Sequence, residues 1–161
     1  MRGSALTYTA TYPISGLNSA RTLLYISSPS DAVVLVTATH VYDESNETNE
    51  QLGIGWHRIT TLGTPTATTL TPTPTHYGFP AAGSTVKGNV TASEPTYPTN
   101  RWDNAYALTG FPTLGGMHYT LVDAGGEPLV ISPSSSYGLR IYSTPTSFDA
   151  IVTVQFEEWG G

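Results

Sequence analysis

Cysteine is absent from this sequence, and charge is scarce. Without cysteine among its 161 residues, the chain has no disulfide, no thiolate nucleophile and no cysteine-bound zinc. Charged residues make up 11% of the chain, against roughly 25% in an average soluble domain. Its surface must therefore consist mainly of neutral hydroxyl and amide groups. This composition favours a protein that is packed against something or works outside the cytoplasm over a freely diffusing cytosolic enzyme.

Positive charge is the scarcest kind. Six Lys and Arg residues face twelve Asp and Glu residues, which gives a net charge of −6, and Lys87 is the only lysine. No basic stripe exists to neutralise phosphates, so we expect no nucleic-acid partner. No stretch approaches the ~20 apolar residues of a membrane span, so we expect no membrane partner. The N-terminal segment lacks the apolar run of a secretion signal, so we expect synthesis in a cytoplasm and release by cell lysis.

Helical periodicity is also missing, and strand signals take its place. No window keeps apolar residues at three-and-four spacing for more than about two turns. Runs such as "ALTYTATY", "AVVLVTATHVY" and "DAIVTVQFEE" alternate or are rich in β-branched residues, and turn clusters such as "SSPSD" and "DAGGE" separate them. Roughly eight to ten strands in one domain of this length indicate a two-sheet sandwich or a closed barrel. We predict an all-β, antiparallel two-sheet sandwich.

Two stretches depart from this rhythm. The Thr/Pro-rich run at residues 61–80 contains prolines that cannot donate to a central ladder, so we expect an edge strand or an extended surface segment there. Residues 93–116 carry aromatic side chains without periodicity. We expect a long loop at that position, and loops of such length in compact domains are usually functional.

The closing segment has the pattern of a half-buried strand. Val152 and Phe156 fall on one face of it, and Glu158 continues that face. We expect the Glu158 carboxylate to meet a backbone amide, an arginine such as Arg140, or a neighbouring subunit. Because Glu157 and Glu158 are adjacent, they point to opposite faces of the strand and do not form a catalytic carboxylate pair.

No catalytic constellation stands out. The four histidines lie on four separate segments, and none has a second histidine or a carboxylate at ligand spacing, so we predict no metal site. The acidic run "YDESNETNE" lacks the glycine and distal glutamate of a calcium loop. Neither a nucleophile elbow nor a phosphate-binding loop is present. We therefore predict no catalytic residue, no cofactor and no enzymatic activity.

The C-terminal third resembles a pattern seen in small structural proteins of tailed bacteriophages. The resemblance rests on "PLVISPSSSYGLRIYSTPTSFDAIVTVQFEEWGG", where a "GLRI" strand, a proline-containing turn and a last strand ending in Phe-Glu-Glu-x-Gly-Gly follow one another. The segment "GNVTASEPT" resembles a further piece of the pattern. Together these segments cover roughly a third of the chain. The Phe-Glu-Glu-x-Gly-Gly end is the specific part, since alternating strands with proline turns are common.

The resemblance implies a capsid decoration, or cement, protein of jelly-roll type. Such proteins bind the outside of a phage head as trimers or dimers, clamp neighbouring capsomers, carry no cofactor and are not enzymes. We accordingly expect a jelly-roll-like sandwich over residues 18–161 and an extended N-terminal arm over residues 1–17. The expected partners are the major capsid protein lattice and further copies of the chain, as a homotrimer or a dimer. The protein is then made in the bacterial cytoplasm and ends on the capsid exterior of the virion.

Three parts of the chain are assigned to contacts under this hypothesis. We expect the arm to contact the lattice and the loop around Trp102 to contact other subunits. Near Trp159 we expect a neighbouring subunit to pair with the last strand and complete it. The predicted interface residues are Arg2, Leu6, Tyr8, Tyr12, Trp102, Asn104, Tyr106 and Trp159.

Two other functions stay open. A tail-fibre, receptor-binding or carbohydrate-binding domain shares the sandwich architecture, and it predicts that Trp56, Trp102 or Tyr106 is exposed in a concave groove.

The second is a β-sandwich glycan lyase or hydrolase. Such an enzyme needs a cluster of His, Arg, Tyr and carboxylate groups, and the only candidates for it are His57, Arg58 and Tyr119.

Overall fold

The computed structural model describes residues 6–46, 52–99, 105–110, 117–120 and 128–160. Within these ranges every regular element is a strand and none is a helix, as predicted. The strands are β1 (Leu6–Leu17), β2 (Arg21–Ser27), β3 (Ala32–Asn46), β4 (Leu52–Arg58), β5 (Thr66–Leu70), β6 (Thr73–Pro74), β7 (Thr85–Ala92), β8 (Ala105–Gly110), β9 (Met117–Thr120), β10 (Leu129–Ile131), β11 (Ser136–Ile141) and β12 (Phe148–Gly160).

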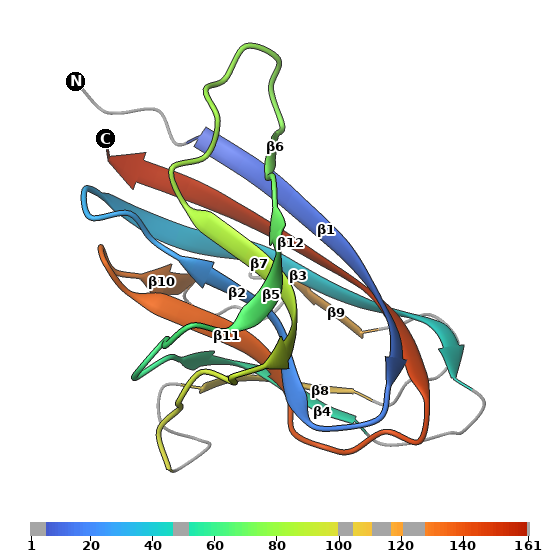
Figure 1. The fold of residues 1–161 in the computed structure, drawn as a ribbon. Coiled ribbons are helices and arrows are strands. Elements are labelled where there is room, and N and C mark those ends of the chain that lie inside the picture. Colours follow the sequence, from blue (N-terminus) through green and yellow to red (C-terminus); the bar gives the residue numbers. More distant parts are fainter. Residues whose placement is uncertain (1–5, 47–51, 100–104, 111–116, 121–127, 161) are drawn as a thin grey trace.

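The strands form two antiparallel sheets that pack face to face (Figure 1). Sheet A has the order β10-β3-β12-β1-β6, and β9 also pairs with β3. Sheet B has the order β5-β7-β2-β11-β4-β8. The prediction of an all-β, antiparallel two-sheet sandwich is confirmed.

The strand pairing follows the jelly-roll arrangement. β1 pairs with β12, β2 with β11, β3 with β10 and β4 with β8, so the chain forms nested antiparallel pairs that alternate between the two sheets. The β3–β12 and β4–β11 ladders join these pairs within each sheet. Nested pairs wrapped into two sheets define a jelly roll. The remaining strands between β4 and β8 extend the sheets, with β6 beyond β1 in sheet A and β7 and β5 beyond β2 in sheet B.

The hydrophobic core lies between the sheets and draws on both of them. On β12, buried residues alternate with partly exposed ones from Phe148 to Glu158, as the sequence pattern predicts. Trp56 of β4 crosses the core, and its indole N–H donates to the Thr39 hydroxyl of β3 at 2.9 Å. Burying each large apolar side chain contributes about 1.5–3 kcal/mol to folding. The largest fully buried side chains of this core are Trp56, Tyr8, Phe148 and Phe156.

The last strand lies inside sheet A and not at its edge. β12 pairs with β1 on one side and with β3 on the other, as far as Gly160 opposite Ala32. The prediction that a neighbouring subunit completes this strand is therefore wrong from Phe148 to Glu158, where the chain itself pairs with both edges. For Trp159 and Gly160 the β3 edge is filled by the chain, and pairing at the other edge stays a prediction.

Residues 6–17 are also part of the sandwich. They form β1, whose alternate residues Tyr8, Ala10 and Ile14 are buried between the sheets. The prediction of an extended arm over residues 1–17 is wrong for this portion, because its apolar alternation drives it into the core. Residues 1–5 lie outside the described part of the chain.

Of the predictions for the two irregular stretches, one is confirmed and one is wrong. Within residues 61–80, β5 lies at an edge of sheet B and the two-residue β6 at an edge of sheet A, so the edge-strand prediction is confirmed. Residues 93–116 are not one long loop, because they contain β8, which pairs with β4. The sequence "AYALTG" of β8 does not alternate clearly between polar and apolar residues, which is why the pattern misses this strand.

Candidate functional site

The outer face of sheet A is mostly polar and rich in threonine. On β1, Thr7, Thr9 and Thr11 alternate with buried residues, and Thr153 and Gln155 do the same on β12. The Thr11 and Thr153 hydroxyl oxygens lie 3.0 Å apart across the strands. This part of the face is suited to contact with water.

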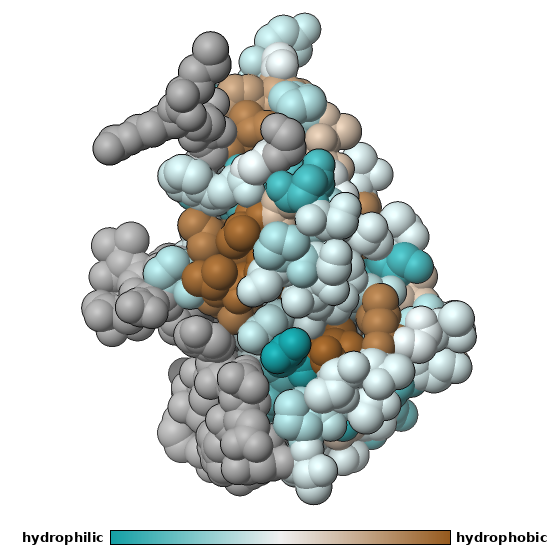
Figure 2. All heavy atoms as spheres, turned by 90° about the vertical axis from the view of Figure 1, so that its left-hand side faces the viewer, coloured by the Kyte–Doolittle hydropathy of each residue, from teal (hydrophilic) through white to brown (hydrophobic). Residues whose placement is uncertain are grey.

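At one end of the same face the polar pattern gives way to an apolar patch. We define the patch as Val33 and Leu35 of β3, Val130 of β10 and Trp159 of β12. The strand register places Trp159 opposite Val33 and Val130 opposite Leu35. Val130 is 46% exposed and Trp159 is 45% exposed. Figure 2, which views the side where β10 and the end of β12 lie, shows hydrophobic residues reaching the surface among hydrophilic ones.

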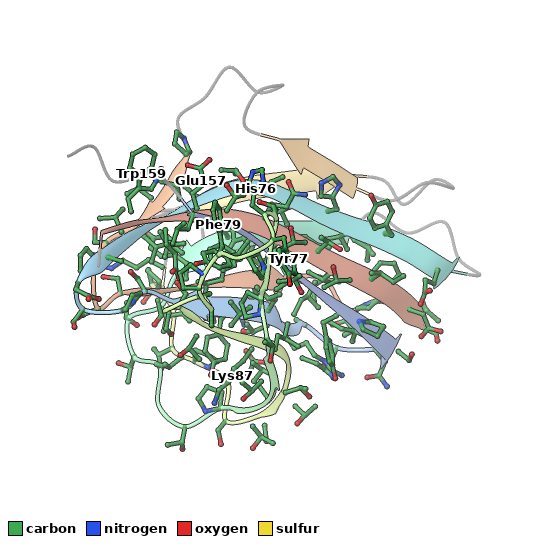
Figure 3. The ribbon with its side chains drawn as sticks, turned by 90° about the horizontal axis from the view of Figure 1, so that it is seen from above. His76, Tyr77, Phe79, Lys87, Glu157 and Trp159 are labelled. Carbon is green, nitrogen blue, oxygen red and sulfur yellow. The ribbon has the colours of Figure 1, made fainter. Side chains whose placement is uncertain are left out.

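A carboxylate borders the apolar patch. Glu157 lies opposite Leu35, and its Oε2 accepts a hydrogen bond from the Trp159 indole N–H at 3.1 Å. Figure 3 shows these two side chains together on the sheet A side of the sandwich. The patch therefore fits a partner with an apolar centre and an N–H donor or a cation facing Glu157.

The outer face of sheet B is covered by the chain itself. Residues 93–99 cross it, and a bridge between Thr61 and Thr96 ties them to the segment after β4. The backbone N–H and the hydroxyl of Thr22 both donate to the Glu94 carboxylate, at 3.0 and 2.6 Å. The Thr22 hydroxyl also lies 2.7 Å from that of Tyr97. Below this segment a second, smaller core contains Tyr25, Ile59 and Val90.

Aromatic and cationic side chains complete this covering. The Arg140 guanidinium carbon lies 4.9 Å from the centroid of the Tyr97 ring. The His57 ring meets the Tyr97 and Tyr142 rings edge-on, at 6.0 and 5.0 Å between centroids, and its Nε2 contacts the Tyr142 hydroxyl. Gly138 leaves room for Tyr97, since an added Cβ would collide with the phenol oxygen. We call the polar side chains of this covering the polar cluster: Thr22, His57, Glu94, Tyr97, Arg140 and Tyr142.

Burial favours the neutral forms of His57 and Tyr97. It lowers the pKa of His57, and the nearby Arg140 charge lowers that pKa further. Burial also raises the pKa of Tyr97 to about 12, although the Thr22 hydrogen bond opposes the shift. These groups bond to and stack on one another, an arrangement that fastens residues 93–99 to sheet B.

Glu158 fastens another segment. Its side chain is buried at the end of β12, and its carboxylate accepts hydrogen bonds from the backbone N–H groups of Gly83 and Ser84 at 3.0 and 2.7 Å. Of the three partners considered for Glu158, a backbone amide is thus the correct one, within its own chain.

The interface residues predicted on the N-terminal segment are engaged within the chain. Tyr8 is wholly buried, and its hydroxyl donates to the Pro80 carbonyl oxygen at 3.2 Å. The Tyr12 hydroxyl lies 3.1 Å from that of Thr68 on β5. Leu6 is partly buried against the core. An interface role for Tyr8 is wrong, because no part of its side chain reaches the surface.

The remaining predicted interface residues divide into three groups. Trp159 is exposed on the apolar patch, and its contact role stays a prediction. Arg2, Trp102 and Asn104 lie outside the described residues. Tyr106 lies in strand β8 opposite Trp56 and not in a loop, and its side chain is outside the described part.

The residues named for the alternative functions do not come together. Trp56 is buried, so the prediction that it is exposed in a groove is wrong. His57 is buried whereas its neighbour Arg58 is exposed, because adjacent strand residues face opposite sides. Tyr119 lies in β9 of sheet A, away from the polar cluster on sheet B.

Among the residues that the structure describes, no group of three or more His, Cys, Asp or Glu side chains is placed to hold a metal ion. No helix in that part is long and apolar enough to span a membrane. Comparisons with protein-family models, with curated proteins and with solved structures find no match to this chain. Its function is therefore inferred from its own residues.

The sequence pattern misses most of the apolar patch. Val33, Leu35 and Val130 belong to strands whose pairing depends on the complete topology, so nothing local signals that they meet. An aromatic residue next to the closing Gly-Gly is the one available signal, and it points to Trp159. The polar cluster is missed for the same reason, because its members come from β2, β4, β11 and two connections.

Proposed function

We propose that this protein is a structural component of a virus particle, a decoration protein that binds the exterior of a bacteriophage head and stabilises its capsid lattice. In this role it has no catalytic residues and no cofactor. It is made in the bacterial cytoplasm and leaves the cell within the particle. Its partners are the major capsid protein and further copies of itself.

The observation that carries the proposal is the apolar patch on an otherwise polar sheet face. Trp159 of β12 and Val130 of β10 are both exposed, on the two strands that flank β3, although the chain buries its other tryptophan in the described part, Trp56, completely. Tryptophan is enriched at the centres of protein interfaces, where its large area is removed from water. A decoration protein needs such a contact surface on a folded body.

Two further features support the proposal. Jelly rolls are common among viral capsid proteins, so the fold agrees with the proposal. They also occur in lectins and other proteins, so the fold alone does not decide the function. The second feature is the small number of charged residues, which suits a protein whose surface is partly covered in an assembly.

Such a protein stabilises a lattice by mass action. If it binds the assembled lattice and not the separate subunits, its binding free energy opposes disassembly. Many copies on symmetric positions multiply a modest contact into a large total effect. Association of the copies as a trimer or dimer adds to this effect, and light scattering after size-exclusion chromatography measures the oligomeric state directly.

The proposal is tested with particles released by the bacterium that carries the gene. Mass spectrometry of purified particles should detect the chain, and particles from a gene deletion should bind the added purified protein saturably. We expect Trp159→Ala to bind at least about tenfold more weakly. Tyr42→Ala is the matched control, because Tyr42 lies on the same strand as Val33 and is equally exposed, at 45%. Particles that lack the chain, and that do not bind it when it is added, would contradict the proposal.

Binding of a glycan is the second candidate function. The exposed side chains of Trp159 and Tyr77 favour it, because aromatic rings can stack on sugars. A glycan array separates the two functions: specific, saturable binding that is lost in Trp159→Ala or Tyr77→Ala favours the glycan, whereas its absence favours the decoration role.

A further inference from the structure

The connection between β6 and β7, residues 75–84, extends from one end of the sandwich (Figure 1). Near its tip, Tyr77 has a relative exposure of 108%, the largest among the exposed large hydrophobic residues in the described ranges. Figure 3 shows His76, Tyr77 and Phe79 on this connection, while Lys87 lies toward the sheet B side. A fully exposed tyrosine side chain buries no apolar surface, so it adds nothing to the free energy of folding. Its position therefore has a reason other than stability.

The base of this loop is held by a buried carboxylate. Burying a carboxylate is unfavourable unless hydrogen bonds compensate for the lost water. Glu158 has three such donors, and all belong to the last two residues of the loop: the N–H groups of Gly83 and Ser84, and the Ser84 hydroxyl. The chain thus places a buried charge where its main effect is to fix the end of the loop.

Two bonds to β1 hold the remainder of the loop. The Tyr8 hydroxyl, at the end of a wholly buried side chain, donates to the Pro80 carbonyl oxygen at 3.2 Å. At the start of the loop, the Thr75 N–H donates to the Thr7 carbonyl oxygen at 2.9 Å. The loop is therefore tied to the sandwich at its beginning, in its second half and at its end.

The tip has its own local structure. The Phe79 N–H donates to the His76 carbonyl oxygen at 3.3 Å, and the two rings lie 5.2 Å apart. Gly78 lies inside this turn with a φ of 91°, a conformation that side-chain-bearing residues rarely adopt. Tyr77 is thus presented outward from a closed turn.

We infer that the β6–β7 loop is a preorganised docking finger, whose Tyr77 side chain inserts into an apolar pocket of a protein partner. Residues 75–84 contain no Asp, Glu, Lys or Arg, so the matching pocket is neutral and apolar, with one hydrogen-bond acceptor for the phenol. The tip projects outward, whereas sugar sites are concave, which favours a protein pocket. Preorganisation reduces the ordering cost of binding, and tyrosine is a frequent hot-spot residue.

The inference rests on the proposed function, because it takes the capsid lattice as the partner. Its test uses particles from the gene deletion and purified full-length variants, with wild type showing saturable binding. We expect Tyr77→Ala to weaken binding at least tenfold and Tyr77→Phe less than Tyr77→Ala, while Tyr42→Ala binds like wild type. Tyr77→Ala binding within twofold of wild type overturns the finger and leaves the decoration role intact. If wild type itself does not bind, both proposals fall.

A second variant tests the bracing on the free protein. In Glu158→Gln the side-chain NH₂ group cannot accept a hydrogen bond, so Gly83 and Ser84 lose part of their acceptor. We expect at least tenfold faster hydrogen–deuterium exchange in the segment that contains Gly83 and Ser84, with unchanged exchange in β11, and a three- to tenfold loss of particle binding. Exchange and binding both equal to wild type would overturn the preorganised finger. If Glu158→Gln fails to fold, Ser84→Ala, which removes only the hydroxyl bond, serves in its place with the same two readouts.

Discussion

The outer faces of the two sheets are built from similar strands, but they differ in how far the rest of the chain covers them. On sheet B, residues 93–99 lie across the strands and the polar cluster fastens them there. On sheet A, threonines face water and the apolar patch around Trp159 and Val130 stays exposed. Residues 93–99 thus cover the outer face of sheet B, whereas Val130 and Trp159 on the outer face of sheet A stay exposed. Under the proposed function, sheet A is therefore the side on which the partner binds.

The two tryptophans of the described residues give the largest contrast. Trp56→Ala removes a wholly buried side chain that bonds to Thr39, and we expect it to lower the free energy of unfolding by about 3–5 kcal/mol. Trp159→Ala removes a side chain from the surface, and we expect a change within about 0.5 kcal/mol. Urea unfolding followed by circular dichroism measures both. A loss in Trp159→Ala as large as that in Trp56→Ala would mean that the patch is part of the core.

Gly138 tests how tightly residues 93–99 pack on sheet B. In Gly138→Ala the new Cβ collides with the Tyr97 phenol oxygen, so we expect a loss of about 1–3 kcal/mol and faster proteolysis within residues 93–99. The loss should shrink in the Tyr97→Phe background, because that change removes the colliding atom. Equal losses in both backgrounds would show that Tyr97 does not occupy this site.

A pair of Thr→Val substitutions compares the faces directly. Thr22→Val removes the hydroxyl that bonds to Glu94 and contacts Tyr97, and we expect it to cost about 1 kcal/mol. Thr11→Val makes the same change on the open face, where the hydroxyl contacts that of Thr153 in water, and we expect a change within about 0.5 kcal/mol. Thermal unfolding gives both values, and the comparison fails if the order is reversed.

The smallest expected effect depends on pH. Because burial and Arg140 lower the pKa of His57 in the folded state, the unfolded chain takes up a proton near pH 6.5 that the folded chain does not. The His57 contribution to stability is therefore present above about pH 6.5 and decreases as the pH falls toward the folded-state pKa. Unfolding free energies measured between pH 5 and 8 should depend less on pH in His57→Gln than in the wild type. Identical slopes in the two proteins would contradict the burial of a neutral His57 under residues 93–99.

The sequence predicts where the strands lie better than it predicts which strands pair with one another. Alternation identifies β12 and its buried face, and prolines identify the edge strands around residues 66–74, because both are local properties. The same alternation in β1 is visible in "LTYTATY", yet assigning it to an arm is wrong, since a local pattern does not reveal that Tyr8 will pair with Phe156. The apolar patch and the polar cluster depend on contacts between distant strands. They therefore follow only from the three-dimensional arrangement.

The most direct test of the account is side-chain oxidation by hydroxyl radicals, compared between the free protein and the protein bound to particles. We predict that Trp159 is readily oxidised in the free protein and protected on the particle, while the buried Trp56 is protected in both states. Equal oxidation of Trp159 in the free and bound protein would contradict the claim that the open face of sheet A is the docking surface.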